Sequence, residues 1–204
     1  MKIIQFKHLI DTGNFSKTEQ WANLKSQIIK AIECVQWPPN SGSFILHDQS
    51  GRKRGQGNGV KPIKEACMLH LKSEGWQLET PVDIVTPKST GAVDATYKID
   101  NKFFAVEWET GNISSSHRAL NKMALGLLKN VLVGGVLILP TRNMYRYLTD
   151  RVGNYRELEP YFYMWESLAS KISEGLLAVV AIEHDGVSKD VSRIPKGTDG
   201  RALT

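Results

Sequence analysis

Cysteine is scarce in this sequence of 204 residues, which contains only Cys34 and Cys67. A disulfide framework or a zinc site needs more cysteines, or cysteine and histidine residues at closer spacing. Both cysteines lie in stretches with a helical pattern. We therefore expect two free, buried thiols in a reducing cytosol.

Long apolar runs are also absent. The longest run, VLVGGVLIL at 131–139, suits a buried strand but falls far short of the roughly 20 residues that span a bilayer. The N-terminal MKIIQFKHLI has no unbroken apolar core and no small-residue cleavage site, so it does not match a signal peptide. These absences argue against a membrane partner.

The net charge excludes few classes of protein or partner. A formal net charge of +5 indicates an anionic partner only weakly, because many enzymes carry such a charge for solubility. Hydrophobic residues make up 41% of the chain and charged residues 23%, as in ordinary globular proteins. We expect a single domain over residues 1–204, with 184–204 largely in loops.

The spacing of apolar residues predicts alternating helices and strands. Ser16 and Glu19 fit a capping box at the start of the first helix. Helices are expected at 16–35, 62–74, from about 115, at 141–151 and at 161–172. Strands are expected at 76–80, 82–85, 93–99, 103–109, 131–139 and 176–183. This order predicts an α/β fold, a mixed sheet flanked by helices on both sides.

Three carboxylates are expected to meet on one hairpin. Strands 93–99 and 103–109 are separated by turn residues, so positions that sum to about 201 should pair, and Asp94 should lie opposite Glu107. Glu107 and Glu109 are two residues apart and therefore point to the same face of the strand, whereas Trp108 points to the other.

Clustered carboxylates repel one another and therefore raise one another's pKa. A bound divalent cation offsets this repulsion. A set of oxygen ligands favours Mg²⁺, with Mn²⁺ as a substitute, and such a site is suited to metal-assisted phosphodiester hydrolysis. Spacing alone leaves open the alternative that the hairpin has a solvated acidic face.

Side chains that can contact bases follow this hairpin. Asn112, Ser114 and Arg118 lie at the start of the next helix, and such side chains match base edges in a DNA major groove. Asp150 and Arg151 could bind the two halves of a G·C pair. The alternatives are helix capping by Ser114 or Ser115 and an ordinary surface ion pair.

Two long motifs, ETGNISSSHR at 109–118 and YLTDRVGNYRELEPYF at 147–162, resemble type II restriction endonucleases of the BamHI family. GVKPIKE at 59–65 and IPKGTDG at 194–200 extend the resemblance over about 58–200. It implies a PD-(D/E)XK nuclease core in the bacterial cytoplasm. The implied activity is Mg²⁺-dependent hydrolysis of double-stranded DNA at GGATCC, after the first G, which leaves 5′ GATC overhangs with 5′-phosphate ends.

The resemblance also assigns residues. It implies that the catalytic acids are Glu79, Asp94, Glu107 and Glu109, and that Asp94, Glu107 and Glu79 hold metal. Glu109 stands where most of the wider superfamily has lysine, and a carboxylate there is suited to orienting or deprotonating water. The implied DNA-binding residues are Lys64, Asn112, Ser114, Arg118, Asp150 and Arg151.

A palindromic site requires a two-fold dimer. The resemblance implies that helices near 115–129 and 157–171 form this homodimer, although their apolar faces also fit an intrachain core. Arg52, Lys53 and Arg54 are candidates to replace the basic C-terminal tail of BamHI, and a solvated loop is the alternative. We expect His117 to pack or cap rather than act as a base. Rival functions are a DNA-binding protein without cleavage and a repair nuclease on the same core.

Overall fold

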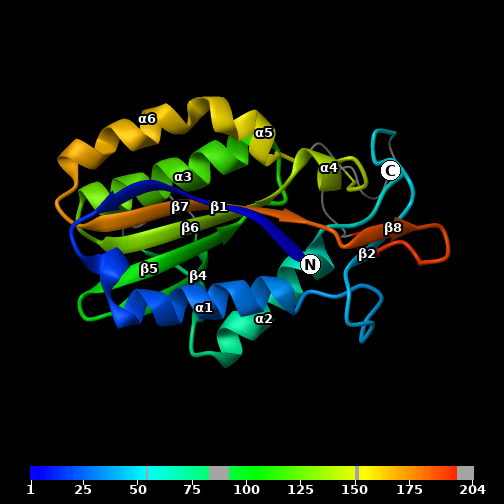
Figure 1. The fold of residues 1–204 in the computed structure, drawn as a ribbon, viewed down its shortest axis with the longest axis horizontal. Helices are drawn as coiled ribbons and strands as arrows, with labels where there is room; N and C mark the ends of the chain where they lie inside the picture. The colour runs from blue at the N-terminus through cyan, green and yellow to red at the C-terminus, as the bar shows by residue number, and fades with distance from the viewer. Residues whose placement is uncertain (54, 83–91, 150–151, 197–204) are drawn as a thin grey trace.

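The structure is a computed structural model that describes residues 1–53, 55–82, 92–149 and 152–196. Within these residues a six-stranded mixed sheet forms the centre (Figure 1). In sheet order its strands are β1 (Lys2–Thr12), β7 (Gly175–Glu183), β6 (Leu132–Pro140), β5 (Lys102–Trp108), β4 (Val93–Ile99) and β3 (Gln77–Thr80). Strands β5, β6 and β7 are parallel to one another. The pairs β1 with β7, β4 with β5 and β3 with β4 are antiparallel.

Helices cover both faces of the sheet, as the sequence predicts. Helices α1 (Glu19–Glu33) and α2 (Lys61–Ser73) lie on one face, and α3 (Ile113–Leu128), α5 (Tyr155–Leu158) and α6 (Phe162–Glu166) lie on the other (Figure 1). The central strand β6 is buried along its whole length. A Cβ atom on its Gly135 would lie 2.6 Å from the sulfur of Met123, so glycine is needed here for the close approach of α3.

The first helix starts later than predicted. Phe15–Lys17 forms a 3-10 turn, and α1 begins at Glu19. The cap is the side chain of Thr18, which accepts a hydrogen bond from the backbone N–H of Trp21 at 3.2 Å. The capping box at Ser16 and Glu19 is therefore wrong, because a threonine closer to the helix makes the bond.

The helix predicted at 141–151 is reduced to α4 (Arg142–Tyr145). The backbone that follows is paired with a loop instead. The carbonyl of Arg146 accepts from the N–H of Gly51 at 2.8 Å, and the N–H of Thr149 donates to Asn58 at 2.7 Å. These bonds use groups that a longer helix would need for itself.

The helix predicted at 161–172 is present, but it alternates between 3-10 and α-helical segments. A 3-10 turn at Glu159–Tyr161 leads into α6, and a second 3-10 segment follows at Ser167–Lys171. The hydroxyl of Ser167 donates to the carbonyl of Met164 at 2.8 Å. Serine hydroxyls compete for backbone acceptors in this way, which weakens a regular α-helix.

Strand β1 is absent from the sequence prediction. Its pairing with β7 shifts register twice, between Ile3 and Gln5 and between His8 and Ile10. Each shift interrupts the alternation of buried and exposed side chains that identifies a strand in a sequence. The predicted strand at 82–85 lies almost wholly outside the described residues.

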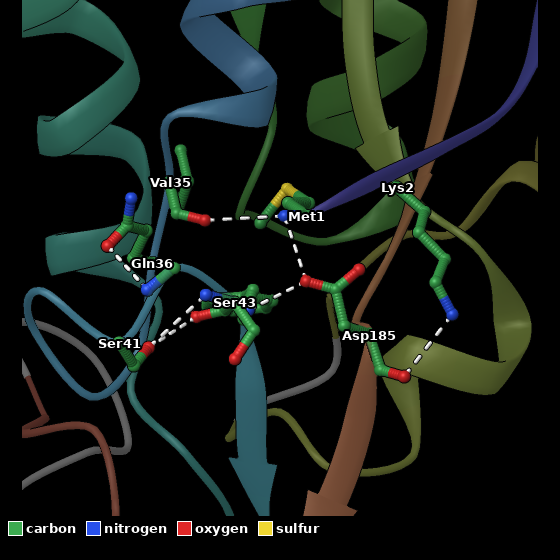
Figure 2. Close-up of polar contacts among 9 residues, drawn as sticks. Met1, Lys2, Val35, Gln36, Ser41, Ser43 and Asp185 are labelled. Carbon is green, nitrogen blue, oxygen red and sulfur yellow. Dashed lines mark hydrogen bonds and ion pairs between the residues drawn. The ribbon is translucent and has the colours of Figure 1, made fainter.

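A small second sheet consists of β2 (Ile45–His47) and β8 (Gly186–Ser188), and the start of β1 contacts the residue that precedes β8. Figure 2 shows the amino group of Met1 donating to the Val35 carbonyl at 3.4 Å and to the Asp185 carboxylate at 3.1 Å. Asp185 also accepts from the N–H of Phe44 at 2.7 Å. Burial alone would raise the pKa of Asp185, but these donors outweigh it and hold the pKa below its usual value.

Both cysteines are free, as expected. Cys67 is buried, whereas Cys34 is only partly buried. Burial raises the pKa of the Cys67 thiol well above its usual value. No helix among the described residues has the length and apolar character to cross a membrane.

Candidate active site

The hairpin of β4 and β5 brings two of the predicted acids together. Its pairs run from Ile99 with Lys102 to Ala95 with Val106, which confirms the predicted register. The N–H of Asp94 lies 3.4 Å from Oε2 of Glu107 and donates to it. The Asp94 carboxylate accepts in turn from the backbone N–H of Trp108 at 2.8 Å.

Glu107 is a buried carboxylate, with 5% of the residue exposed. Burial raises its pKa, and the charge of Asp94 raises it further. The ammonium of Lys122, which comes from α3, forms an ion pair with Glu107 and opposes this rise. The carboxylate therefore depends on a neighbouring positive charge to stay ionised.

Glu109 directly follows β5, and its N–H donates to the carbonyl of Ile138 at 2.9 Å. Burial, followed by the charges of Glu107 and Asp94, raises the pKa of Glu109 to about 7. Lys64 opposes the rise only in part. A carboxyl group that titrates near neutrality is suited to accept a proton from water.

Lys64 lies inside the carboxylate cluster. Its Nζ on α2 donates to Oδ1 of Asp94 at 2.6 Å. The resemblance implies DNA contact for Lys64, and the structure shows its ammonium paired with one of the acids. Its side chain remains 34% exposed, so it can also face an approaching anion.

Glu79 lies on the neighbouring strand. The pairs of Leu78 with Ala95 and of Thr80 with Val93 bracket it, which places Glu79 beside Asp94 in the register. Its φ of 48° is in the left-handed region, where glutamate is strained, and the residue is exposed. Strain of this kind is concentrated at functional sites.

The donor chemistry of this cluster fits a hard divalent cation, because its groups are carboxylate oxygens. Across residues 1–53, 55–82, 92–149 and 152–196, however, no three Asp, Glu, His or Cys side chains are gathered closely enough to hold a metal ion as they stand. Asp94 and Glu107 are paired with lysines instead.

The predicted base-contact residues of α3 are exposed. Asn112 caps the helix, and its side-chain oxygen accepts from the N–H of Ser115 at 3.2 Å. Thus Asn112, rather than either serine, is the cap. Ser114 and Arg118 are both exposed and lie one turn apart on α3.

The second predicted base-contact pair, Asp150 and Arg151, lies outside the described residues. The segment that follows this pair contacts the start of α3. The N–H of Gly153 donates to the carbonyl of Gly111, just before the helix, at 2.7 Å. A Cβ atom on Gly153 would lie 2.8 Å from the Cα of Ile113, so only glycine allows this approach. The loop residue Arg54 also lies outside the described part.

His117 packs, as predicted. Its ring makes an edge contact with Tyr161, with centroids 4.7 Å apart, and lies 5.5 Å from the ring of Trp165. These contacts join α3 to the helical segment 155–171. The outer side of that segment exposes Tyr161, Tyr163 and Met164.

Lys122 was missed in the sequence. It follows Ser114 and Arg118 at intervals of four residues, so the three share one side of α3. This spacing indicates the shared side of α3, but not that Lys122 reaches Glu107.

Comparison with a solved structure identifies the fold. The crystal structure of the restriction endonuclease BglII in complex with a DNA 16-mer superposes with a TM-score of 0.59, at 15% identity, over 95% of this chain and 88% of that one. The mixed sheet with helices on both faces is therefore the PD-(D/E)XK fold of restriction endonucleases.

The family follows from sequence. The family model for restriction endonuclease BamHI matches residues 1–201. The type II restriction enzyme OkrAI of Oceanobacter kriegii is 52% identical over the full length of both chains. BamHI of Bacillus amyloliquefaciens is 37% identical over 80% of this chain and 75% of that enzyme.

The chain belongs to the BamHI family of restriction endonucleases, and it is a type II site-specific deoxyribonuclease. The motifs alone left open that the chain was OkrAI itself. The 52% identity makes it a relative of that enzyme. Enzymes of this class generally use divalent metal ions.

Proposed function

We propose that the enzyme acts as a homodimer of single-domain subunits in the bacterial cytoplasm. It hydrolyses double-stranded DNA at GGATCC in the presence of Mg²⁺, for which Mn²⁺ can substitute. Cleavage after the first G leaves 5′ GATC overhangs with 5′-phosphate ends. One observation carries the proposal: a short turn joins the carboxylate cluster to the exposed base-contact face of α3, so cutting and recognition share one surface.

The acids have separate roles under this proposal. Asp94 and Glu107, with Glu79 beside them, would hold Mg²⁺, which stabilises negative charge on the attacking and leaving oxygens. Glu109 would orient the attacking water and accept its proton. Its pKa of about 7 supports this role, because a base is most effective when its pKa is near the working pH.

Base recognition is assigned to two segments. Arg118 suits guanine, Asn112 suits adenine, and Ser114 can bond to either kind of edge. Asp150 and Arg151 together would bind the cytosine and guanine of one pair. Lys64 would contact a phosphate, and its partial exposure beside Asp94 supports that assignment.

The dimer interface is assigned to α3 and the segment 157–171. The site is palindromic, so a two-fold axis would give one half-site to each subunit. The exposed Tyr163 and Met164, which are 79% and 58% exposed in the single chain, support an interface there.

A plasmid with one GGATCC site tests the proposal, with a plasmid lacking the site as control. Each is incubated with Mg²⁺ or with EDTA, and the product ends are sequenced. The proposal predicts a single cut after the first G, in Mg²⁺ alone, in the first plasmid only. Cuts elsewhere would overturn the recognition assignment, and cutting in EDTA would overturn the metal assignment.

A further inference from the structure

Lys122 is enclosed to an unusual degree for a lysine. Only 9% of its side chain is exposed, and its partner Glu107 has 6% of its side chain exposed. Lysine is rarely so buried unless it is paired. The ammonium also donates to the carbonyl of Ala92 at 3.1 Å, just before β4. The ammonium of Lys122 therefore joins α3 to β5 and to the residue that precedes β4.

The two lysines of the cluster differ in access to solvent. The side chain of Lys64 on Asp94 is 34% exposed, against 9% for Lys122 on Glu107. Lys64 can leave its carboxylate for solvent or for a phosphate group. Lys122 occupies an enclosed position against a carboxylate that would otherwise be a buried charge without a partner, which is strongly destabilising.

A divalent cation on Glu107 would compete with this ammonium. Both are positive, both need the same carboxylate, and their repulsion at close range in a partly buried site is strong. The Ala92 carbonyl gives the ammonium an acceptor that does not depend on Glu107. Lys122 therefore has a second partner to keep when it moves away.

We propose that Lys122 is a built-in counter-ion that neutralises Glu107 in the metal-free enzyme and withdraws from it when a divalent cation binds, so that this lysine sets the metal affinity of the site. Lys122 has this role only if Glu107 is a metal ligand, as under the proposed function. It is a positioning residue, since it acts through Glu107.

The test is calorimetric titration of Mn²⁺ into the full chain without DNA, which measures the Mn²⁺ affinity. Lys122→Met should bind Mn²⁺ roughly tenfold more tightly than the wild type, because a competing charged hydrogen bond is lost. Lys122→Arg retains the charge and should stay close to the wild type. Lys129→Met is the matched control, since Lys129 is exposed at the end of the same helix, and it should change nothing.

Thermal melting in EDTA gives a readout that does not depend on metal binding. Lys122→Met should melt below the wild type, because Glu107 loses its partner. Adding Glu107→Gln to Lys122→Met should recover most of that loss, which also shows that the methionine itself is accommodated. Mn²⁺ should raise the melting temperature of Lys122→Met more than that of the wild type.

The outcomes separate the two proposals. Wild-type Mn²⁺ binding that disappears in Glu107→Gln but is unchanged or weaker in Lys122→Met would overturn the role of Lys122 and leave the metal site standing. A wild type that binds no Mn²⁺ would overturn the metal site, and the role of Lys122 with it.

Discussion

The Nζ atom of Lys64 lies 2.6 Å from Oδ1 of Asp94 and joins helix α2 to strand β4 at the carboxylate cluster. The pair is partly exposed, with 34% of the lysine side chain and 16% of the aspartate side chain accessible. The ammonium is therefore accessible from solvent while it is bound to Asp94.

Lys64→Met should weaken DNA binding about equally for sequences with and without the site, because a phosphate contact carries no base information. The slope of log affinity against log salt should fall by about 1. Fluorescence anisotropy over a salt series measures both. Lys72→Met is the control, since Lys72 is exposed near the end of the same helix. An unchanged salt slope in Lys64→Met would remove Lys64 from the interface.

Arg118→Ala should relax recognition at one G·C pair by about 1–3 kcal/mol. Arg118 is exposed on α3, so the fold should not change. Competition binding with duplexes substituted at each position of GGATCC measures the loss. Lys30→Ala on the exposed face of α1 removes the same charge from the other side of the sheet and should keep the site preference. If Arg118→Ala also keeps it, Arg118 does not contact a base.

Asn58→Ala should destabilise the protein by about 1–3 kcal/mol. Asn58 is fully buried, and its side chain bonds to His47, Tyr147 and Ile194 at distances between 2.9 and 3.3 Å. Its loss removes the side-chain acceptor of the N–H groups of His47 and Ile194, whereas the carbonyls of His47 and Tyr147 keep backbone donors. Urea unfolding measures the change, with Asn23→Ala on exposed α1 as control. Equal stability of the two variants would mean that water replaces the Asn58 side chain.

The pKa of Glu109, raised from 4.5 to about 7, predicts a pH dependence of stability. The folded state holds this proton more tightly than the unfolded chain. The proton on Glu109 therefore stabilises the folded state fully below the unfolded pKa of 4.5, and this stabilisation is lost as pH rises through about 7. In EDTA, the melting temperature of the wild type minus that of Glu109→Gln should fall between pH 4.5 and pH 8. A constant difference would show that Glu109 titrates normally.

Much of the hairpin could be predicted from sequence. Turn residues at 100–102 and alternating side chains determine the register, and the observed pairing of Ala95 with Val106 follows it. The exposure of Ser114 and Arg118 also follows from helical spacing. These features depend on residues close together in the chain.

The positive charges of the cluster could not be predicted in the same way. Lys64 and Lys122 meet the acids because α2 and α3 pack beside the hairpin, and this is a tertiary relationship. The shortened helix at 142–145 has a similar cause. The local pattern favours a longer helix, but the loop near Gly51 and Asn58 binds the same backbone.

Glu107→Gln gives the clearest test of the metal site. The variant should bind a GGATCC duplex in Mg²⁺ with near wild-type affinity, because Glu107 is buried and is not assigned to DNA contact. Its cleavage rate should fall by more than the roughly 10- to 100-fold seen when an outer partner of a metal site is lost. Glu33→Gln, on the exposed side of α1, should cut normally. Binding with little or no cleavage is the predicted result, and cleavage at the wild-type rate would contradict the assignment of Glu107 as a metal ligand.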